Sequence, residues 1–401
     1  MKLKRHRVLV YGTLMNVVGI SLLGFYFLGL NPAGKALKTQ RDTALASVGL
    51  SSTTCKEYLE NDTWFLQKLQ EEIANPIKAE PKSVDVENVS AESSSVPTIP
   101  KSLKEFGTCL MGTEKMEMLI KEVHVITEID FLSQTIRLTS HEDDDSIHRL
   151  FTEFNGVNDA RYKLTRDFND VVSPLFLDIG ANLGFVSIAF LKFHSTAQVV
   201  AFEPNAFTYV YLLWNLYLNQ IPILTSDQLN KDPFTPGVYP VFGGIAGGHN
   251  NGDNVDESLI TTTSPVQEAP VGPSQLYVPD LKTTARGNAV KFYHLSAFMK
   301  KYNLDRFDFV KMDCECCEYL VIPANKELFS DNTIIKHIAG ELHPFEICKT
   351  YFDLDIKAQD EVVQTLDNRG CTLPSHAYDE NEFVGNKGPG GHCCPPICLH
   401  Q

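Results

Sequence analysis

The sequence predicts an α/β fold, a mostly parallel sheet with helices on both faces, preceded by an N-terminal transmembrane helix and a stem. Three observations support this expectation. Short apolar runs alternate with segments of helical spacing between residues 175 and 342, the pattern of parallel strands joined by helices. Residues 8–30 carry no formal charge, and residues 31–105 are poor in aromatic side chains. The chain therefore divides into an anchor, a spacer and a folded body.

The uncharged stretch predicts a transmembrane signal anchor. About 20 apolar residues, each rising about 1.5 Å, cross the hydrocarbon layer. A cleaved signal peptide is the alternative, but its apolar region spans about 7–15 residues, and Asn31-Pro32-Ala33 is a poor cleavage site. Several basic residues within residues 1–7 favour a cytosolic tip, with the body across the membrane.

Residues 31–105 predict a low-complexity stem, with one helix expected at about 56–74. The stretch contains prolines and a run of serines, and it has too little apolar surface to fold alone. Asn61 and Asn88 each begin an N-glycosylation sequon, and the chain has 10 cysteines, an even number that suits disulfide formation in an oxidising compartment. We therefore expect a single-pass type II membrane protein of the ER or Golgi membrane with a luminal body.

The body, residues 106–401, is expected to form one domain with a core at about 140–345 and a cysteine-rich C-terminal tail. Its lead-in contains a predicted strand pair within 122–140 and a short helix at 146–154. The sequence predicts strands at 175–180, 198–204, 240–247, 307–313 and 335–342, and helices at 185–194, 207–220 and 292–302. Residues 249–288 are rich in Gly, Asn, Thr and Pro, so they form either a disordered loop or a substrate-facing insertion.

Charge narrows the class of ligand. The chain has 35 Lys and Arg residues against 50 Asp and Glu residues, a formal net charge of −15. Such a balance disfavours nucleic acid, which is held through its phosphates. The acidic body favours a neutral or cationic ligand.

The turn after the first predicted strand of the sheet, residues 178–184, indicates a binding site. Ligands of parallel sheets lie beyond the carboxyl ends of the strands, where strand order reverses. Gly180 and Gly184 allow close approach of a ligand, Asp178 can accept hydrogen bonds from an ammonium group, and the following helix N-terminus favours a carboxylate. Glu203 ends the second strand, where an acid binds ribose hydroxyls. No complete phosphate-binding glycine motif is present, so a zwitterionic ligand with a ribose fits better.

Four segments together resemble a known family: LDIGANLG, VVAFEPN, DFVKMDCECCE and GELH, in this order. Their order and spacing are similar to those of FkbM-type S-adenosylmethionine-dependent methyltransferases over about residues 140–345. The resemblance implies a Rossmann-like class I methyltransferase fold, bound S-adenosyl-L-methionine and methyl transfer to oxygen. It also implies that the methionine part of the cofactor faces Asp178, Gly180, Asn182 and Gly184, and that the ribose side faces Glu203 and Asn205.

Two positions depart from the family pattern. Cys316 stands where the fourth-strand motif usually has glycine, and Ser296 follows Leu295 where the family has aspartate. If position 316 adopts a positive φ, a cysteine there costs on the order of 1–2 kcal/mol. Neither change touches the turn at residues 178–184, so both bear on turnover and not on cofactor binding.

The candidate catalytic residues are Asp313, Glu315, Glu341 and His343, which are expected at the ends of the fourth and fifth strands. Methyl transfer requires positioning of the acceptor oxygen and a base for its proton, and the ordinary pKa of histidine suits that base. The alternative is that Glu341 and His343 only cap a strand or hydrogen-bond a loop.

No metal site is predicted from the sequence. Cys314, Cys316 and Cys317 could bind zinc together with cysteines and histidines of the tail, but disulfides are favoured in a lumen. Residues 143–145 form an Asp triplet that could be the D-x-D motif of a metal-dependent glycosyltransferase, although a loop or helix cap is favoured.

We therefore expect an S-adenosylmethionine-dependent O-methyltransferase that acts on a hydroxyl, most simply of a glycan in the secretory pathway. A lipid or other small hydroxyl-bearing molecule is the next acceptor class. Two rivals remain: a non-catalytic membrane glycoprotein that uses the fold as a binding module, which Cys316 favours, and a type II glycosyltransferase.

Overall fold

The computed structural model describes residues 45–46, 49–60, 62–75, 98–123, 126–142, 146–154, 162–168, 171–232, 234–245, 291–352, 354–371 and 381–386. The chain divides into two units, Met1–Lys56 and Glu57–Gln401. The predicted tip and anchor at 1–30, both sequon asparagines, the Asp triplet, the 249–288 insertion and the tail from 387 lie outside the described residues. None of the helices within the described ranges has the length and apolarity of a membrane span.

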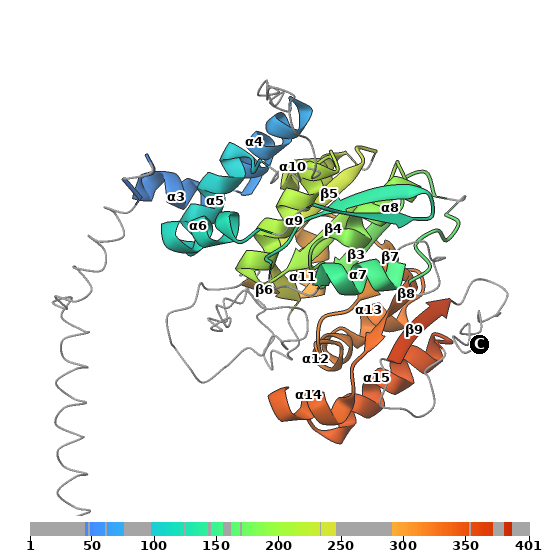
Figure 1. Ribbon diagram of the computed structural model, residues 1–401. Coiled ribbons are helices and arrows are strands. Elements are labelled where there is room, and N and C mark those ends of the chain that lie inside the picture. Colours follow the sequence, from blue (N-terminus) through green and yellow to red (C-terminus); the bar gives the residue numbers. More distant parts are fainter. Residues whose placement is uncertain are drawn as a thin grey trace, which may run out of the picture. The chain divides into compact units, whose positions relative to one another are not determined.

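A seven-stranded sheet forms the centre of the second unit, in the order β6-β5-β4-β3-β7-β8-β9 (Figure 1). Every neighbouring pair is parallel except β8 and β9, which are antiparallel. The strands are β3 (Leu175–Ile179), β4 (Gln198–Glu203), β5 (Gly237–Ile245), β6 (Lys291–Tyr293), β7 (Phe307–Met312), β8 (Ile335–Leu342) and β9 (Asn381–Asn386). The mostly parallel sheet expected from the sequence is confirmed.

Strand order reverses at β3, because β4 lies on one side of it and β7 on the other. Ligands of open parallel sheets bind at such a point, beyond the carboxyl ends of the strands. The reversal therefore places the candidate site at the loops that follow β3, β4 and β7.

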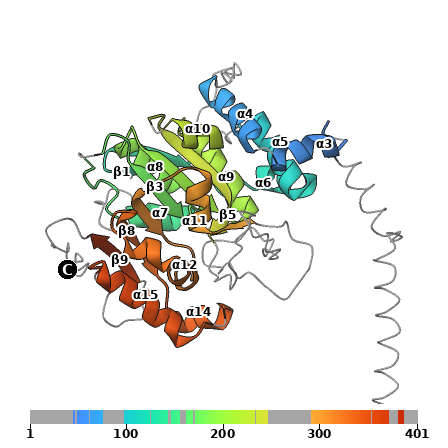
Figure 2. The same cartoon turned by 180° about the vertical axis from the view of Figure 1, so that it is seen from behind.

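Helices cover the sheet. Every residue of β4 and of β7 is buried, as expected for parallel strands whose two faces are both packed. Figure 2 shows α12, α14 and α15 grouped beside β8 and β9. The helices are α8 (Phe185–Phe193), α9 (Ala206–Leu218), α10 (Ser226–Lys231), α11 (Leu295–Lys301), α12 (Glu318–Ala324), α13 (Lys326–Ser330), α14 (Phe345–Phe352) and α15 (Ile356–Asn368).

The lead-in contains the expected hairpin and helix. Strands β1 (Thr127–Phe131) and β2 (Gln134–Leu138) pair antiparallel, and α7 spans Ser146–Phe154. The two turn residues between the strands, Leu132 and Ser133, have φ of 48° and 67°, as in the type I′ turns that suit two-residue hairpins.

The N-terminal helices of the described chain are α3 (Ser52–Glu60), α4 (Asp62–Ala74), α5 (Lys101–Met111) and α6 (Thr113–Lys121). The helix expected at about 56–74 thus falls on α3 and α4. Within the second unit, Phe65 of α4 stacks on Phe106 with ring centroids 4.1 Å apart, and Gln70 Oε1 accepts a hydrogen bond from Ile223 N. The segment expected to be a spacer therefore includes a helix that packs on the body, because one face of α4 is apolar.

Two strands were not expected, and one begins earlier than expected. Strand β6 has three residues and β9 has the sequence NEFVGN, so neither shows the continuous apolar run of a buried parallel strand. Strand β5 begins at Gly237 instead of residue 240. The site lies away from these differences, at the central strands.

Candidate active site

The loop after β3 depends on glycine. Gly180 and Gly184 have φ of 80° and 84°, a region that side chains with a Cβ rarely adopt. A Cβ on Gly180 would lie 2.0 Å from the carbonyl oxygen of Asp313. The amides of Gly180 and Ala181 donate to the carbonyl oxygen of Phe202 at 3.1 and 2.9 Å. The loop is therefore fastened to the end of β4 and lies directly against the loop after β7.

A buried ion pair between Asp178 and Lys311 holds this loop in place. The carboxylate of Asp178 is fully buried, accepts a hydrogen bond from Ser187 Oγ at 2.7 Å, and lies 3.3 Å from Lys311 Nζ. Lys311 Nζ also donates to the carbonyl oxygen of Gly180 at 2.8 Å. Asp178, which the resemblance places against the methionine part of the cofactor, thus lies under the loop and orients it through Lys311. Lys311 belongs to the segment DFVKMDCECCE, whose resemblance to the family did not indicate this contact.

Glu203 is held by the backbone amides of Asn205, expected beside it, and of Asn182, which the resemblance places at the methionine part of the cofactor. Its Oε2 accepts from the amide of Asn182 at 3.0 Å, and its Oε1 accepts from the amide of Asn205 at 2.8 Å. Burial raises the pKa of Glu203 from its ordinary 4.5 to about 7, although both amides and Lys311 favour the ionised form. The side chain of Asn205 accepts from Phe207 N and Thr208 N, so it caps α9 and leaves its backbone amide to orient Glu203.

Asn215 is a positioning residue that sequence reasoning missed. It is fully buried on α9, and its Nδ2 donates to the carbonyl oxygens of Leu183 at 2.9 Å and Thr139 at 3.1 Å. Its Oδ1 accepts from Thr139 N at 2.8 Å. One amide therefore ties the loop after β3 to the segment that follows β2. The available signal was a single amide side chain in a helix that is otherwise mostly apolar and aromatic.

The four candidate catalytic residues come together at the ends of β7 and β8. His343 Nε2 lies 3.9 Å from Asp313 Oδ1, 3.5 Å from Glu315 Oε2 and 4.0 Å from Glu341 Oε2. Tyr162, which the sequence did not indicate, places its hydroxyl 3.0 Å from Asp313 Oδ2 and 3.2 Å from Glu341 Oε1. We call these five residues the carboxylate–histidine cluster.

Electrostatics in the cluster differ from the expectation for His343. Burial lowers its pKa, but Glu318, Asp313 and Glu315 more than offset this and raise the pKa to about 9. Glu318 is fully buried, and its Oε1 lies 2.7 Å from His343 N and 3.0 Å from Nδ1. This raised pKa favours the charged form of His343 at neutral pH, whereas the ordinary pKa favours the neutral form, and the part of His343 in proton transfer stays a prediction.

Glu315 is better suited to accept a proton. Burial raises its pKa from 4.5 to about 7, while the charge of His343 opposes this rise. Its carboxylate is ionised in a large fraction of molecules at neutral pH, and a base is most effective when its pKa is near the operating pH. Sequence reasoning could not assign this difference, because it depends on Glu318 and on burial.

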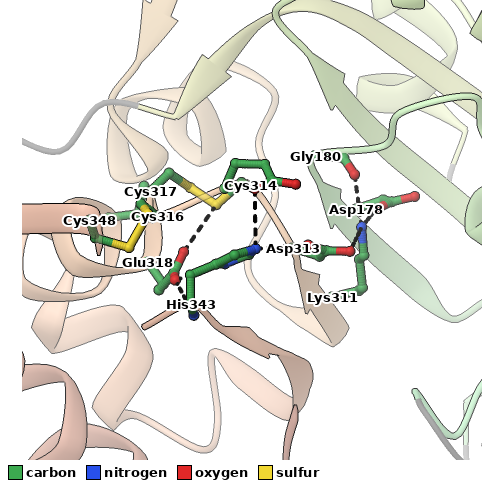
Figure 3. Close-up of a disulfide and its surroundings, with 12 residues drawn as sticks. Asp178, Gly180, Lys311, Asp313, Cys314, Cys316, Cys317, Glu318, His343 and Cys348 are labelled. Atoms are coloured by element: carbon green, nitrogen blue, oxygen red, sulfur yellow. Dashed lines mark hydrogen bonds and ion pairs between the residues drawn. A yellow bond between two sulfur atoms is a disulfide. The ribbon is translucent and has the colours of Figure 1, made fainter. Parts of the chain in front are cut away.

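Two disulfides hold the loop after β7, Cys314–Cys317 and Cys316–Cys348 (Figure 3). Glu315 and Cys316 have φ of 54° and 78°, so the position where the family has glycine is left-handed here too. Cys348 lies on α14, after β8. These bonds confirm the preference for disulfides over zinc at Cys314, Cys316 and Cys317, while the cysteines of the tail lie outside the described residues.

A comparison with known protein families gives one match, within the sheet domain. Residues 178–372 match the family model of the methyltransferase FkbM domain. The matched segment is just under half of the 401 residues and contains every site residue expected from the sequence. It indicates an S-adenosylmethionine-dependent methyltransferase, with S-adenosyl-L-methionine as cofactor. No curated protein matches the chain.

Solved structures give weaker likenesses. Precorrin-6y C5,15-methyltransferase from Geobacter metallireducens GS-15 is 10% identical, covering 55% of this chain and 83% of that one, with a TM-score of 0.27. A fibrillarin/Nop5p complex is 10% identical over 54% of this chain and 74% of that one, also with a TM-score of 0.27. The small RNA methyltransferase HEN1 is 7% identical over 59% of this chain and 28% of that one, with a TM-score of 0.28. Because these scores are low, the fold assignment depends on the sheet topology instead.

The segment that matches the FkbM model has residues that fit the cofactor. Glu203 ends β4, where an acid accepts hydrogen bonds from ribose hydroxyls, and the loop from Gly180 to Gly184 leads into the N-terminus of α8, which favours a carboxylate. When bound, S-adenosylmethionine supplies a methyl group on a sulfonium sulfur. The protein's own residues hold the loop after β3, orient Glu203 and place the carboxylate–histidine cluster beside that loop.

Proposed function

We propose that the protein is an O-methyltransferase that acts on a hydroxyl of a glycan. The observation that supports this most directly is the position of Lys311. Its Nζ contacts Asp178 and the carbonyl oxygen of Gly180 in the cofactor loop, and lies 3.9 Å from Asp313 Oδ2 in the carboxylate–histidine cluster. A single side chain thus connects the two parts, so a hydroxyl held at the cluster is close to the cofactor loop.

The proposed reaction needs positioning and one proton acceptor. The acceptor oxygen forms a bond to the methyl carbon, the bond from that carbon to sulfur breaks, and its electron pair remains on sulfur. The proton of the hydroxyl passes to Glu315, whose pKa of about 7 allows it to accept a proton at neutral pH. Alignment of the oxygen contributes the largest part of the acceleration.

The proposed compartment is the lumen of the ER or Golgi, with the chain anchored as a type II membrane protein through residues 8–30. The two disulfides of the loop after β7 support an oxidising environment. The sequons at Asn61 and Asn88 agree with it. A luminal enzyme meets glycans, and a neutral sugar hydroxyl suits an acidic body. Hydroxyls of lipids or other small molecules are the next acceptor class.

The structure of the loop after β7 bears on the rival hypothesis, a non-catalytic binding module. A cysteine in place of glycine suggested a damaged loop, yet Cys316 keeps the left-handed backbone and is bonded to Cys348. The substitution is therefore accompanied by a second residue that holds the same backbone shape. This observation favours a functional site over a decayed one.

Methyl transfer by the purified full-length protein tests the proposal. With labelled S-adenosylmethionine and a pool of glycans, the wild type should transfer label, and Glu315→Gln should lower the rate by about 10²–10⁴-fold without changing cofactor affinity. Glu327→Gln, at an exposed glutamate on α13, is the matched control and should leave the rate unchanged. Failure of the wild type to bind the cofactor would refute the proposal, and binding without transfer would favour the module.

Topology has a separate test. Glycosidase treatment should increase gel mobility of the protein isolated from cells, and Asn61→Gln with Asn88→Gln should abolish that shift. Unchanged mobility of the wild type after treatment would contradict a luminal body.

A further inference from the structure

We infer that Asp313, Glu341 and His343 form a binding site for a divalent cation of the Mn²⁺ or Mg²⁺ class. Asp313 follows β7, and Glu341 and His343 are at the end of β8, the strand next to it in the sheet. One ligand atom from each residue lies within 4.8 Å of the other two. Ligands of a small divalent cation sit about 3 Å apart in adjacent positions and about 4 Å apart in opposite ones. Small side-chain shifts would therefore complete the site.

The distances from His343 indicate an intervening group. Its Nε2 lies 3.9 Å from Asp313 Oδ1 and 4.0 Å from Glu341 Oε2, which is too far for a direct hydrogen bond. A cation bound by all three atoms would occupy the space between them.

The remaining polar atoms of the three residues are held from outside the triad, as is usual for metal ligands. His343 Nδ1 lies 3.0 Å from Oε1 of the fully buried Glu318, which orients the ring and leaves Nε2 toward the triad. The Tyr162 hydroxyl lies 3.0 Å from Asp313 Oδ2 and 3.2 Å from Glu341 Oε1. Having one proton, it donates to one carboxylate at a time. Both carboxylates therefore keep their other oxygen, Oδ1 or Oε2, toward His343.

Charge provides an independent argument. Four carboxylates, those of Asp313, Glu315, Glu318 and Glu341, surround one imidazole, and the side chains of Glu318 and Glu341 are 0% and 7% exposed. Lys311 lies 3.3 Å from the buried Asp178 and 3.9 Å from Asp313, so its one charge is shared between two carboxylates, and Arg149 acts on Glu315. Buried carboxylates need a matching positive charge, and a divalent ion would supply it. A ligand set of two carboxylates and one imidazole suits Mn²⁺ or Mg²⁺, whereas structural zinc is usually held by sulfur-rich ligand sets.

A cation at this position would leave coordination sites for oxygens of the acceptor. It would orient the hydroxyl and make its proton easier to remove, and two neighbouring sugar hydroxyls could bind together. This role rests on the proposed function, whereas binding of the cation itself does not.

Manganese binding to the full-length protein tests the inference. After treatment with a chelator, the protein is titrated with Mn²⁺ and the free ion is followed by electron paramagnetic resonance. We expect one Mn²⁺ per chain, and at least a tenfold loss of affinity in Asp313→Asn and in Glu341→Gln. Tyr162→Phe should weaken binding by about 10- to 100-fold. Glu346→Gln, at an acid whose side chain is 83% exposed, should bind as the wild type does.

Cofactor binding by the same preparations separates folding from metal binding, because a folded variant retains its affinity for S-adenosylmethionine. If Asp313→Asn does not fold, Glu341→Gln and Tyr162→Phe decide the question. The inference is overturned if the wild type binds neither Mn²⁺ nor Mg²⁺, or if affinity is unchanged in the folded variants. Mn²⁺ binding without methyl transfer would refute the proposed function and leave the cation site intact.

Discussion

The loops after β3 and β7 are neighbours that reach left-handed backbone in different ways. They are fastened together, since Asp313 N donates to the carbonyl oxygen of Ile179 at 3.1 Å. The first loop uses glycine at 180 and 184 and an asparagine, Asn182, at φ of 50°, whereas the second places Glu315 and Cys316 at positive φ and holds them with disulfides. The shape of the first loop is thus a local property of its residues. The shape of the second depends on Cys348, 32 residues further along the chain.

The largest effect is expected for Gly180→Ala. Its Cβ would lie 2.0 Å from a backbone oxygen, which cannot move without displacing the loop after β7, so cofactor binding should fall more than 100-fold by calorimetry. Gly112→Ala is the matched control, because Gly112 has φ of 95° with nothing within 4 Å of the added atom. Because φ of 95° with ψ of 159° is a region that glycine adopts almost alone, that variant should lose about 1–3 kcal/mol of unfolding free energy and bind normally. Normal binding by Gly180→Ala would show that the loop is more adaptable than its contacts indicate.

The loss of unfolding free energy on removing each disulfide should increase with the length of chain that the disulfide closes. The bond between Cys316 and Cys348 spans 32 residues, and that between Cys314 and Cys317 spans three. Chain entropy predicts losses of about 3–4 kcal/mol for Cys348→Ala and about 2 kcal/mol for Cys314→Ala. Urea unfolding without reductant measures both, and equal losses would mean that local strain or solvation outweighs chain entropy.

Cofactor affinity should depend on pH through Glu203, which accepts a hydrogen bond from Asn182 of the loop after β3. Its folded pKa of about 7 is above its ordinary 4.5, so its contribution to stability is present below about pH 4.5 and is lost as pH rises through 7. Binding has the opposite sign, because the ionised carboxylate accepts from ribose hydroxyls. Affinity should rise by up to about tenfold per pH unit below pH 7. Calorimetry at several pH values should show this rise for the wild type and a flat profile for Glu203→Gln.

The smallest expected effect is a difference in stability between two variants at position 316, and it measures the backbone strain of the loop after β7. Cys316→Gly and Cys316→Ala both lack the disulfide, but glycine adopts φ near 78° without the penalty of a Cβ. Cys316→Gly should therefore be about 1 kcal/mol more stable than Cys316→Ala in urea unfolding. Equal stabilities would indicate that the loop relaxes once the disulfide is absent.

The sequence predicted the parts of the fold that depend on local pattern. Strands β3, β4 and β7 are short apolar runs, and the Gly180–Gly184 turn follows from glycine spacing, so both were recognised. Contacts between distant segments were not. Tyr162 reaches Asp313 across 151 residues and Asn215 reaches Thr139 across 76, and no periodicity encodes such pairs.

The chemistry of individual groups was the least predictable feature. His343 was expected to be a neutral base, and its pKa of about 9 results from carboxylates that the fold gathers around it, above all Glu318. Residue type gives the ordinary pKa, but burial and neighbours set the actual one. Candidate residues could therefore be located from sequence, whereas their protonation states could not.

Strand β9 has a practical consequence for any shortened form of the protein. It pairs along β8 from Leu342 to His337, and it begins after residue 372, where the family match ends. A protein that stopped there would expose the backbone edge of β8, next to Glu341. Unpaired strand edges recruit other chains by strand addition, so such a form should self-associate through the side of the sheet that bears the carboxylate–histidine cluster.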